Sequence, residues 1–586
     1  MRALLLIVAA AAAFIASPAV ANSDELARAL TDYDALAREA DPVAAGREGD
    51  ADALRLWPDV TPVGVSARAK AYARLRRQVL RVRPQQLSAS EKIDHALLTN
   101  RLAMLIEAEP FGEERIPFIS GDGFYTVADY AAFANTITNE AQAEAWIARL
   151  SALPAYLAAN VDNMRRGLTA GFTQPRLTTT NAIASVRAQL QQPVDRSSLL
   201  LPLTKLPPSI SEQRQRELRA QAAKIVQDEV KPAQRAVLQF FEAEYLPRTR
   251  SSFGISAVPG GADYYAHLIR RHTTTSSSAA EIHRLGLQEV SRVRRNMAEV
   301  MQEVGFKGSL PEFLSELRRN PRFYATSVEA YTASAAEIAK RIDAEVPHFI
   351  GRLPRLPFGL KRVPPEVANT SSGYWQGDPK AGLPGNVMIH GEKVLKFPLF
   401  QLPAWVLHEG VPGHHTQIAL AQEQEGVSSF RRKEDITAFV EGWALYAEHL
   451  GEEMGIYRTP YERFGRLSYE AWRAARLVID TGLHSEGWPR QRAVEYLKSN
   501  TALSQLEVDN EIDRYIGWPG QALAYKIGEL RIRAARARAE AALGSRFDVR
   551  AFHDAVLSNG PVTLSMLEAN LADWTREQQA AVDGRP

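Results

Sequence analysis

The sequence contains no cysteine, which excludes every chemistry that depends on a thiol. Disulfide bridges, thiolate nucleophiles, cysteine-ligated zinc and iron–sulfur clusters cannot form. The chain also has almost no net charge, because 70 Lys and Arg oppose 68 Asp and Glu for a formal charge of +2. This balance gives no reason to expect a nucleic-acid partner or an acidic membrane surface. The 586 residues are 45% hydrophobic and 24% charged, a composition typical of a globular protein.

Long apolar runs are absent except at the N-terminus. Arg2 precedes an apolar stretch from Ala3 to Ala16, and Ala19-Val20-Ala21 follows shortly after it. A bilayer span takes about 20 apolar residues, so this pattern favours a cleavable signal peptide at residues 1–21 over a membrane anchor. No cysteine follows the expected cleavage site, so lipid attachment there is not expected. We expect a periplasmic or secreted protein that makes no membrane contact after cleavage.

Helical periodicity dominates the remaining sequence. Apolar residues three and four positions apart, as in Ala143, Trp146, Leu150 and Leu153, predict helices. A Pro- and Ser-rich interval at 192–211 and the VPGG break at 258–261 interrupt this pattern. We expect an N-terminal helical region at 22–257 and a catalytic region at 258–586, joined in one continuous body. Residues 386–390 (NVMIH) are the best short strand candidate. The expected fold class is mainly α.

Side chains that can perform catalysis concentrate at residues 405–417, WVLHEGVPGHHTQ. Three of the 12 histidines, His408, His414 and His415, lie in this segment, and Glu409 directly follows the first of them. Neutral imidazole binds zinc, and a neighbouring carboxylate can take a proton from metal-activated water. The segment therefore predicts a metal-dependent hydrolase.

The spacing of these histidines differs from the usual H-E-x-x-H motif, in which both imidazoles share one helical face. On a straight helix, His414 would lie on a different face from His408, and His415 would lie about 10 Å further along the axis. Pro412 removes a backbone donor and Gly413 tolerates unusual dihedrals, so a break there could bring His414 beside His408. The alternative is a helix end with histidines in ordinary hydrogen bonds.

Two glutamates further along the chain extend the candidate site. Glu441 and Glu448 are seven residues apart and therefore share one face of a helix among apolar residues. A carboxylate in such a place is costly to bury unless it is paired or bound to a metal. Glu441 is a candidate third ligand, with a salt bridge to an arginine as the alternative. Glu448 is expected to support the ligands from behind.

These residues resemble the bacterial domain-of-unknown-function 885 (DUF885) family, whose members carry H-E-x-x-P-G-H-H-x-Q in place of H-E-x-x-H. The resemblance covers most of the mature chain and includes further blocks at 261–265, 281–286, 439–443, 480–484, 519–528 and 552–554. The family in turn resembles helical zinc peptidases of the gluzincin type, such as thimet oligopeptidase and angiotensin-converting enzyme. In those enzymes a Phe-Val-Glu segment supplies the third ligand. The two-residue insertion at Pro412-Gly413 departs from their pattern.

The resemblance implies a zincin-like body of two helical lobes with a central cleft, and one Zn²⁺ ion. It implies that His408, His414 and Glu441 bind zinc and that Glu409 is the general base. His415 stays open as the alternative ligand. It also implies that the strand beginning at Asn386 lies beside the cleft and pairs with the substrate backbone by β-augmentation.

Further roles follow from the same resemblance. His484 and Tyr525 would occupy positions from which such peptidases donate to the tetrahedral oxyanion. Arg476, Asp480 and His484 are four residues apart, so a helix would align them. They would form either a charge ladder that orients His484 or a plain surface network.

Arg514 and Lys526 are candidates for binding the C-terminal carboxylate of a substrate, although an exposed cation is usually just solvated. The resulting expectation is an exported zinc peptidase that acts on short peptides. A metal-dependent hydrolase of non-peptide amides or esters is one alternative. A catalytically silent peptide-binding protein is the other, and the presence of Glu409 argues against it. No G-x-S-x-G elbow or phosphate-binding loop points to another chemistry.

Overall fold

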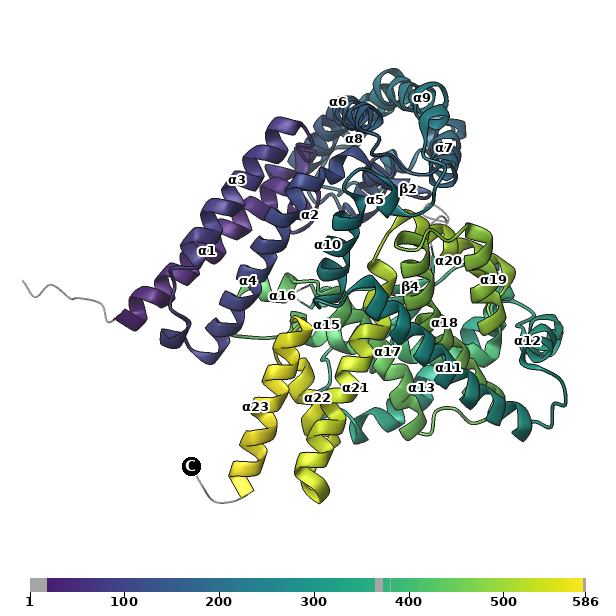
Figure 1. The fold of residues 1–586 in the computed structure, drawn as a ribbon. Coiled ribbons are helices and arrows are strands. Elements are labelled where there is room, and N and C mark those ends of the chain that lie inside the picture. The colour runs from purple at the N-terminus through teal and green to yellow at the C-terminus, as the bar shows by residue number, and fades with distance from the viewer. Residues whose placement is uncertain (1–17, 364–371, 380, 583–586) are drawn as a thin grey trace, which may run out of the picture.

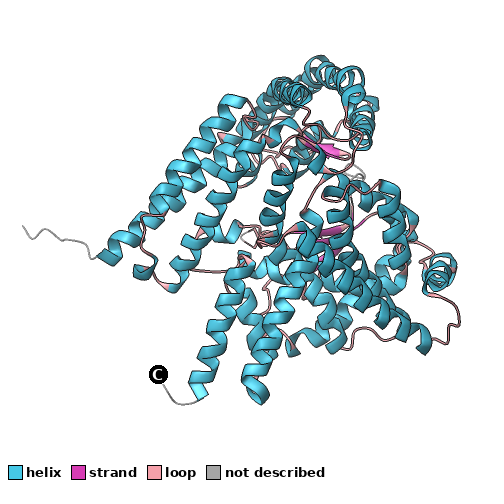
Figure 2. Cartoon of the chain, viewed as in Figure 1, coloured by secondary structure: helices cyan, strands magenta, loops and turns pink. Residues whose placement is uncertain are grey.

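The computed structural model describes residues 18–363, 372–379 and 381–582. Helices account for 73% of the chain and strands for 4%, which confirms the predicted mainly α class (Figure 2). The predicted signal peptide lies largely outside the described residues. Within the described ranges, no helix is both long enough and apolar enough to cross a bilayer.

The part of the chain before residue 258 forms two groups of helices. Along one flank of the molecule lie α1 (Pro18–Ala40), α2 (Pro42–Arg47), α3 (Pro62–Val79) and α4 (Ala89–Ala108) (Figure 1). The second group comprises α5 (Val127–Ala134), α6 (Glu140–Ala170), α7 (Arg176–Gln191), α8 (Glu212–Ile225) and α9 (Lys231–Phe240). This group packs around an apolar core of its own that includes Trp146, Leu150 and Phe241.

The part after residue 258 carries the remaining long helices. The first are α10 (Gly261–Thr273), α11 (Ala279–Glu303), α12 (Leu310–Arg319), α13 (Val328–Glu345), α14 (Leu402–Glu409), α15 (His414–Gln422), α16 (Ser429–Lys433) and α17 (Thr437–Glu453). They are followed by α18 (Pro460–His484), α19 (Arg490–Asn500), α20 (Gln505–Gly517), α21 (Ala524–Leu543), α22 (Val549–Leu557) and α23 (Leu564–Val582). Helices α11 and α18 pack along each other at the centre of this part.

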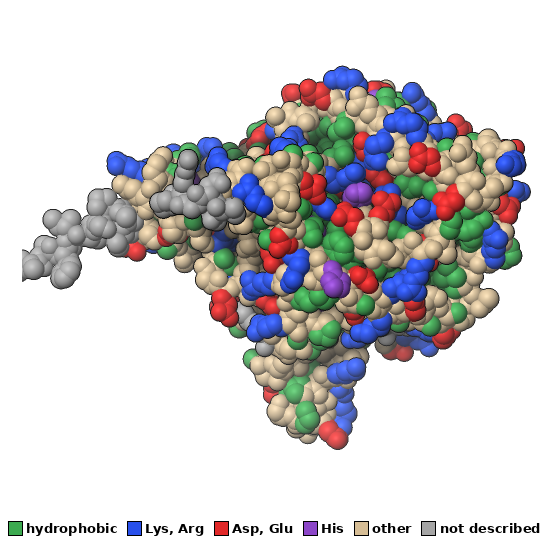
Figure 3. Space-filling view, turned by 90° about the horizontal axis from the view of Figure 1, so that it is seen from below, with side chains coloured by type: hydrophobic (Ala, Val, Ile, Leu, Met, Phe, Trp, Pro, Cys, Tyr) green, Lys and Arg blue, Asp and Glu red, His purple; other side chains and the backbone are tan. Residues whose placement is uncertain are grey.

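One large core connects the two parts of the chain. It contains Ala29, Leu75 and Leu98 from the first flank together with Leu407 and Trp443 from the second part. Residues on both sides of the expected boundary at 257/258 therefore bury their apolar surface against one another. The surface seen from below intersperses basic and acidic side chains without a large area of one sign (Figure 3), as expected for a chain of near-zero net charge.

A small sheet lies amid the helices of the second part (Figure 2). Its strand order is β3 (Phe358–Arg362), β5 (Gly385–Ile389), β4 (Gly373–Trp375), with β5 parallel to β3 and antiparallel to β4. A separate two-stranded ribbon pairs β1 (Phe118–Ile119) with β2 (Asp122–Gly123) in the first part.

Strand β5 matches the predicted strand at 386–390 to within one residue. However, it is the central strand of its sheet, and Asn386 pairs with Gly359 on one side and Trp375 on the other. A central strand has no free edge, so a substrate backbone cannot add to it. The prediction that the substrate pairs with this strand is therefore wrong.

Helices α17 and α21 meet through two glycines. A Cβ atom on Gly442 would lie 2.6 Å from the Cα atom of Gly528, and one on Gly528 would overlap the carbonyl oxygen of Ala438. The two backbones can approach this closely only because neither residue has a side chain. This contact positions α17, which carries Glu441, against α21, which carries Tyr525.

We predict that Gly528→Ala lowers the free energy of unfolding by about 1–3 kcal/mol, because the added methyl group forces the two helices apart. Alanine is otherwise the better helix former by about 1 kcal/mol, so a net loss isolates the packing effect. Denaturant unfolding measures it. Ala537→Ser, which adds one heavy atom to the exposed face of α21, is the control and is expected to change stability little. Equal stability of the two variants would contradict the packing argument.

Candidate metal centre

The helix is interrupted between α14 and α15, at the position that the sequence predicts. Helix α14 ends at Glu409, and α15 begins at His414 after a short loop that contains Pro412. The N–H of Gly413 donates to the carbonyl of Leu407 at 3.1 Å, which folds the loop back onto the end of α14. A Cβ atom on Gly413 would overlap the carbonyl oxygen of His408. Glycine is therefore required there for the chain to fold back.

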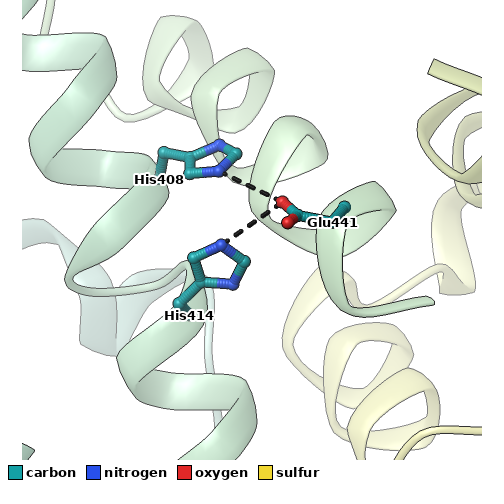
Figure 4. Close-up of side chains that lie close together, drawn as sticks. All are labelled: His408, His414 and Glu441. Atoms are coloured by element: carbon teal, nitrogen blue, oxygen red, sulfur yellow. Dashed lines mark ion pairs between the residues drawn. The ribbon is translucent and has the colours of Figure 1, made fainter. Parts of the chain in front are cut away.

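This break brings two imidazoles and one carboxylate together (Figure 4). The rings of His408 and His414 lie 4.7 Å apart between centroids and are nearly perpendicular. Oε2 of Glu441, from α17, lies 3.5 Å from Nε2 of His408 and 3.4 Å from Nε2 of His414. One donor atom of each residue lies within 4.8 Å of the others. The geometry selects His414 rather than His415 as the partner of His408.

The donor set fits a zinc ion. Two ligand atoms at about 2.1 Å from a tetrahedral zinc lie roughly 3.4 Å apart, and Oε2 of Glu441 lies 3.5 Å and 3.4 Å from Nε2 of the two histidines. Oε2 of Glu441 is buried and makes no well-directed hydrogen bond within the described residues. Burial opposes its charged form, but the neighbouring His414 and His408 outweigh this effect and hold the pKa of Glu441 well below its usual range. An anionic ligand at this position is therefore favoured.

Glu448 supports His408 from behind, where the sequence predicts it. Its Oε1 atom lies 2.8 Å from Nδ1 of His408, and the guanidinium of Arg473 lies 3.2 Å from the same carboxylate oxygen. Burial disfavours a charged His408, but the contacts with Glu441 and Glu448 outweigh it and raise the pKa of His408 to about 9. A carboxylate on Nδ1 directs Nε2 toward Glu441, which is how ligating histidines are oriented in metal sites.

Glu409 lies at the outer edge of the small sheet. The backbone N–H of Tyr374 in β4 donates to Oε2 of Glu409 at 2.7 Å. The N–H and C=O of one residue in an antiparallel strand point the same way, so both groups of Tyr374 face away from β5. The edge of β4 therefore holds the carboxylate of Glu409 in place.

His415 points away from this cluster, so its role as an alternative ligand is ruled out. Its Nε2–H donates to the carbonyl of Leu356 at 3.0 Å, and its Nδ1 accepts from the hydroxyl of Tyr374 at 3.1 Å. Its ring packs against Phe358. Burial lowers the pKa of His415, which agrees with a neutral ring that donates through one nitrogen and accepts through the other. His415 fastens α15 to the sheet.

His484 was expected to donate to an oxyanion, and the structure contradicts this. It is fully buried at the end of α18, and both of its ring nitrogens are used. Nε2–H donates to the carbonyl of Tyr515 at 2.8 Å, and Nδ1 accepts from the N–H of Ile255 at 3.1 Å. Burial lowers the pKa of His484 to about 3, so the ring is neutral. It holds three distant segments together instead of facing a substrate.

Neither the charge ladder nor the surface network predicted for Arg476, Asp480 and His484 forms, because all three side chains are buried and contact different elements. Asp480 accepts from the hydroxyl of Tyr265 at 2.6 Å and from the N–H of Gly520 at 3.1 Å, and burial raises its pKa to about 7. Arg476 instead pairs with Glu511 of α20 at 2.8 Å. Because each side chain contacts a different neighbouring element, Asp480 fixes the turn before α21 and does not orient His484.

Lys526 cannot bind a substrate carboxylate. Its side chain is fully buried, and its Nζ atom lies 2.9 Å from Glu470, 2.9 Å from Glu529 and 3.2 Å from Glu289. These carboxylates already surround the ammonium group. Asn386 lies in the central strand β5, where it is paired with Gly359 on one side and with Trp375 on the other. Neither residue keeps the substrate-binding role predicted for it.

Tyr525 and Arg514 lie together near the start of α21. The guanidinium of Arg514 donates to the hydroxyl of Tyr525 at 3.2 Å, and that of Arg476 lies 4.2 Å from the centre of the tyrosine ring. Tyr525 is one helical turn before Gly528, where α21 touches α17. The roles predicted for Tyr525 in oxyanion stabilisation and for Arg514 in carboxylate binding stay predictions.

Comparison with known proteins gives the family. Residues 42–571 match the family described as "Bacterial protein of unknown function (DUF885)". The chain belongs to the DUF885 family. Among curated proteins, none matches this DUF885 chain.

Two solved structures share the fold. A provisionally assigned lipoprotein from Colwellia psychrerythraea is 26% identical, with a TM-score of 0.87 over 96% of this chain and 100% of that one. A second, from Shewanella oneidensis and of unknown function, is 16% identical, with a TM-score of 0.69 over the same shares of the two chains. At 16% identity, the similarity to the second structure shows a shared fold and nothing about function.

Two residues of the site escape detection from the sequence. Arg473 is one of many arginines in helical stretches, and nothing local shows that it contacts Glu448. Tyr374 lies in the short SSGYWQG segment at 371–377, where two aromatics between glycines are a weak strand signal. That signal could have suggested a strand, but not that its N–H meets Glu409.

We predict that Glu448→Gln weakens zinc binding by about 10- to 100-fold, because the neutral amide orients His408 less firmly. Competition with a chromophoric chelator measures the affinity. Glu453→Gln, on the same helix but paired with Arg536, is the matched control and should bind zinc as wild type does. Unchanged affinity in the Glu448 variant would remove Glu448 from the metal centre.

Proposed function

We propose that this DUF885 chain is a zinc-dependent hydrolase that cleaves peptide bonds in short peptides. The observation that carries the proposal is the convergence of His408, His414 and Glu441 next to a separately fixed Glu409. Three protein ligands that leave a coordination position open are characteristic of catalytic zinc sites, whereas structural zinc sites are closed by four.

Zinc, when bound, supplies a positive charge that lowers the pKa of water to about 7 and polarises a carbonyl group. Glu409 is the residue that moves the proton: its carboxylate accepts it from the attacking water and passes it to the leaving amine. The hydrogen bond from Tyr374 occupies Oε2 of Glu409, which leaves Oε1 as the atom for this transfer. Tyr525 is the candidate donor to the developing oxyanion.

The substrate backbone would pair with β4 at the edge that faces away from β5, and not with the central strand β5 itself. An extended peptide along this edge would run past Glu409 and would pair with the outward-facing carbonyl of Tyr374, because the N–H of that residue is already bonded to Glu409. Main-chain hydrogen bonds to a strand edge bind peptides largely independently of sequence. This arrangement favours a peptide over a small non-peptide amide or ester, which has no backbone to pair.

Two similarities support the proposal. The His-Glu pair and the Phe439-Val-Glu441 segment resemble the ligand-bearing segments of gluzincin peptidases, with the insertion at Pro412-Gly413 absorbed by the break after α14. The similarity to a provisionally assigned lipoprotein from Colwellia psychrerythraea supports export, in line with the N-terminal pattern. The proposed place of action is therefore the periplasm or the exterior.

We predict that Glu409→Gln lowers kcat for peptide hydrolysis by at least about 100-fold, because an amide cannot accept the proton. Zinc content should remain at one ion per chain, since the substitution leaves His408, His414 and Glu441 in place. A mixture of short peptides followed by mass spectrometry measures the rate, and elemental analysis measures the metal. Glu425→Gln, at an exposed position beyond α15, is the control and should act as wild type does.

Other outcomes would overturn the proposal in different ways. A Glu409 variant that cleaves peptides at the wild-type rate contradicts the mechanism. A wild-type protein that cleaves amides or esters but no peptide contradicts the substrate class. A protein that binds peptides and cleaves nothing is the catalytically silent binding protein.

A further inference from the structure

The two faces of the small sheet have different neighbours. Tyr374, Val387 and Leu360 are paired across the strands and share one face, and on this face Tyr374 contacts His415. Successive residues of a strand point to opposite faces, so Trp375 and Met388 lie on the other one. That second face carries a small apolar cluster. One face of the sheet therefore contacts α15, and the other face contacts a different part of the chain.

The second face meets a helix from the N-terminal part. Phe133 of α5 packs edge-on against Trp375, with ring centroids 5.2 Å apart and planes at 75°. The two residues are far apart in sequence, and both are only half-buried. Two large aromatic side chains thus form a partly exposed wall where α5 and β4 meet.

Glu409 lies beside the second face of β4, since a Cβ atom on Gly373 would point to this face and would lie 3.7 Å from Oε2 of Glu409. Trp375 directly follows Tyr374, whose N–H holds Glu409, and consecutive Cα atoms are about 3.8 Å apart. A peptide that adds to the outer edge of β4 alternates its side chains between the two faces. A substrate side chain on the second face would therefore lie against Trp375 and Phe133, within a residue or two of the bond to be cleaved.

We propose that Trp375 and Phe133 form a subsite that selects a large apolar side chain, aromatic or branched aliphatic, next to the cleaved bond. The inference rests on the proposed function and deepens it by naming the substrate class. Half-buried aromatic rings lose their remaining water when an apolar group covers them, and this gain is absent for glycine or serine. Because Phe133 comes from α5, the N-terminal part of the chain takes part in specificity.

The test compares peptides that differ at one position near the cleaved bond, with Phe or Leu replaced by Gly or Ser. Wild type is expected to prefer the apolar peptide by about tenfold or more in kcat/KM. Trp375→Ala and Phe133→Ala should each remove most of this preference, mainly by raising KM for the apolar peptide. Trp375→Leu should restore part of it.

The matched control is Phe306→Ala, which removes a half-buried aromatic that pairs with Phe313 between α11 and α12. It should leave the preference unchanged. If wild type cleaves peptides without preferring apolar side chains, the subsite is wrong and the peptidase proposal stands. If Trp375→Ala slows all peptides equally, the residue is structural and the subsite is likewise wrong. If wild type cleaves no peptide, the proposed function fails and the subsite with it.

Discussion

The close approach of Gly413 to the carbonyl oxygen of His408 is the contact on which the candidate metal centre depends. Without it, α14 would continue, and His414 would turn to another face of the same helix. The break instead starts a second helix whose first residue, His414, returns beside His408. The bond from the indole of Trp443 to the carbonyl of Pro412 at 2.8 Å ties this loop to α17, which carries Glu441. The loop and the proposed third ligand, Glu441, are therefore positioned together.

The remaining parts of the site are held by elements that come from far along the chain. The edge of β4 fixes Glu409, His415 fastens α15 to the same sheet, and α5 of the N-terminal part packs on the opposite face. The buried contacts of His484 and Asp480 join α18 to the segments before α10 and α21. The sequence blocks that resemble the family therefore fall into two sets. One set forms the candidate metal centre, and the other holds the surrounding helices together.

The sequence predicted those features of the site that depend on residues close together in the chain. The break at Pro412-Gly413 followed from the backbone properties of two residue types, and Glu441 followed from the cost of burying a carboxylate. It failed where partners are distant. His484 contacts Ile255, 229 residues away, and Lys526 contacts Glu470, 56 residues away, so neither burial nor pairing could be inferred locally. β5 is central because β3 and β4 flank it, and the sequence indicates both of these short strands only weakly.

Anomalous X-ray scattering at the zinc edge, from a crystal of the protein grown with zinc, tests the central claim most directly. We expect one strong peak at about 2.1 Å from Nε2 of His408, Nε2 of His414 and Oε2 of Glu441. A crystal with no peak among these three atoms, or with zinc bound only elsewhere, would contradict it.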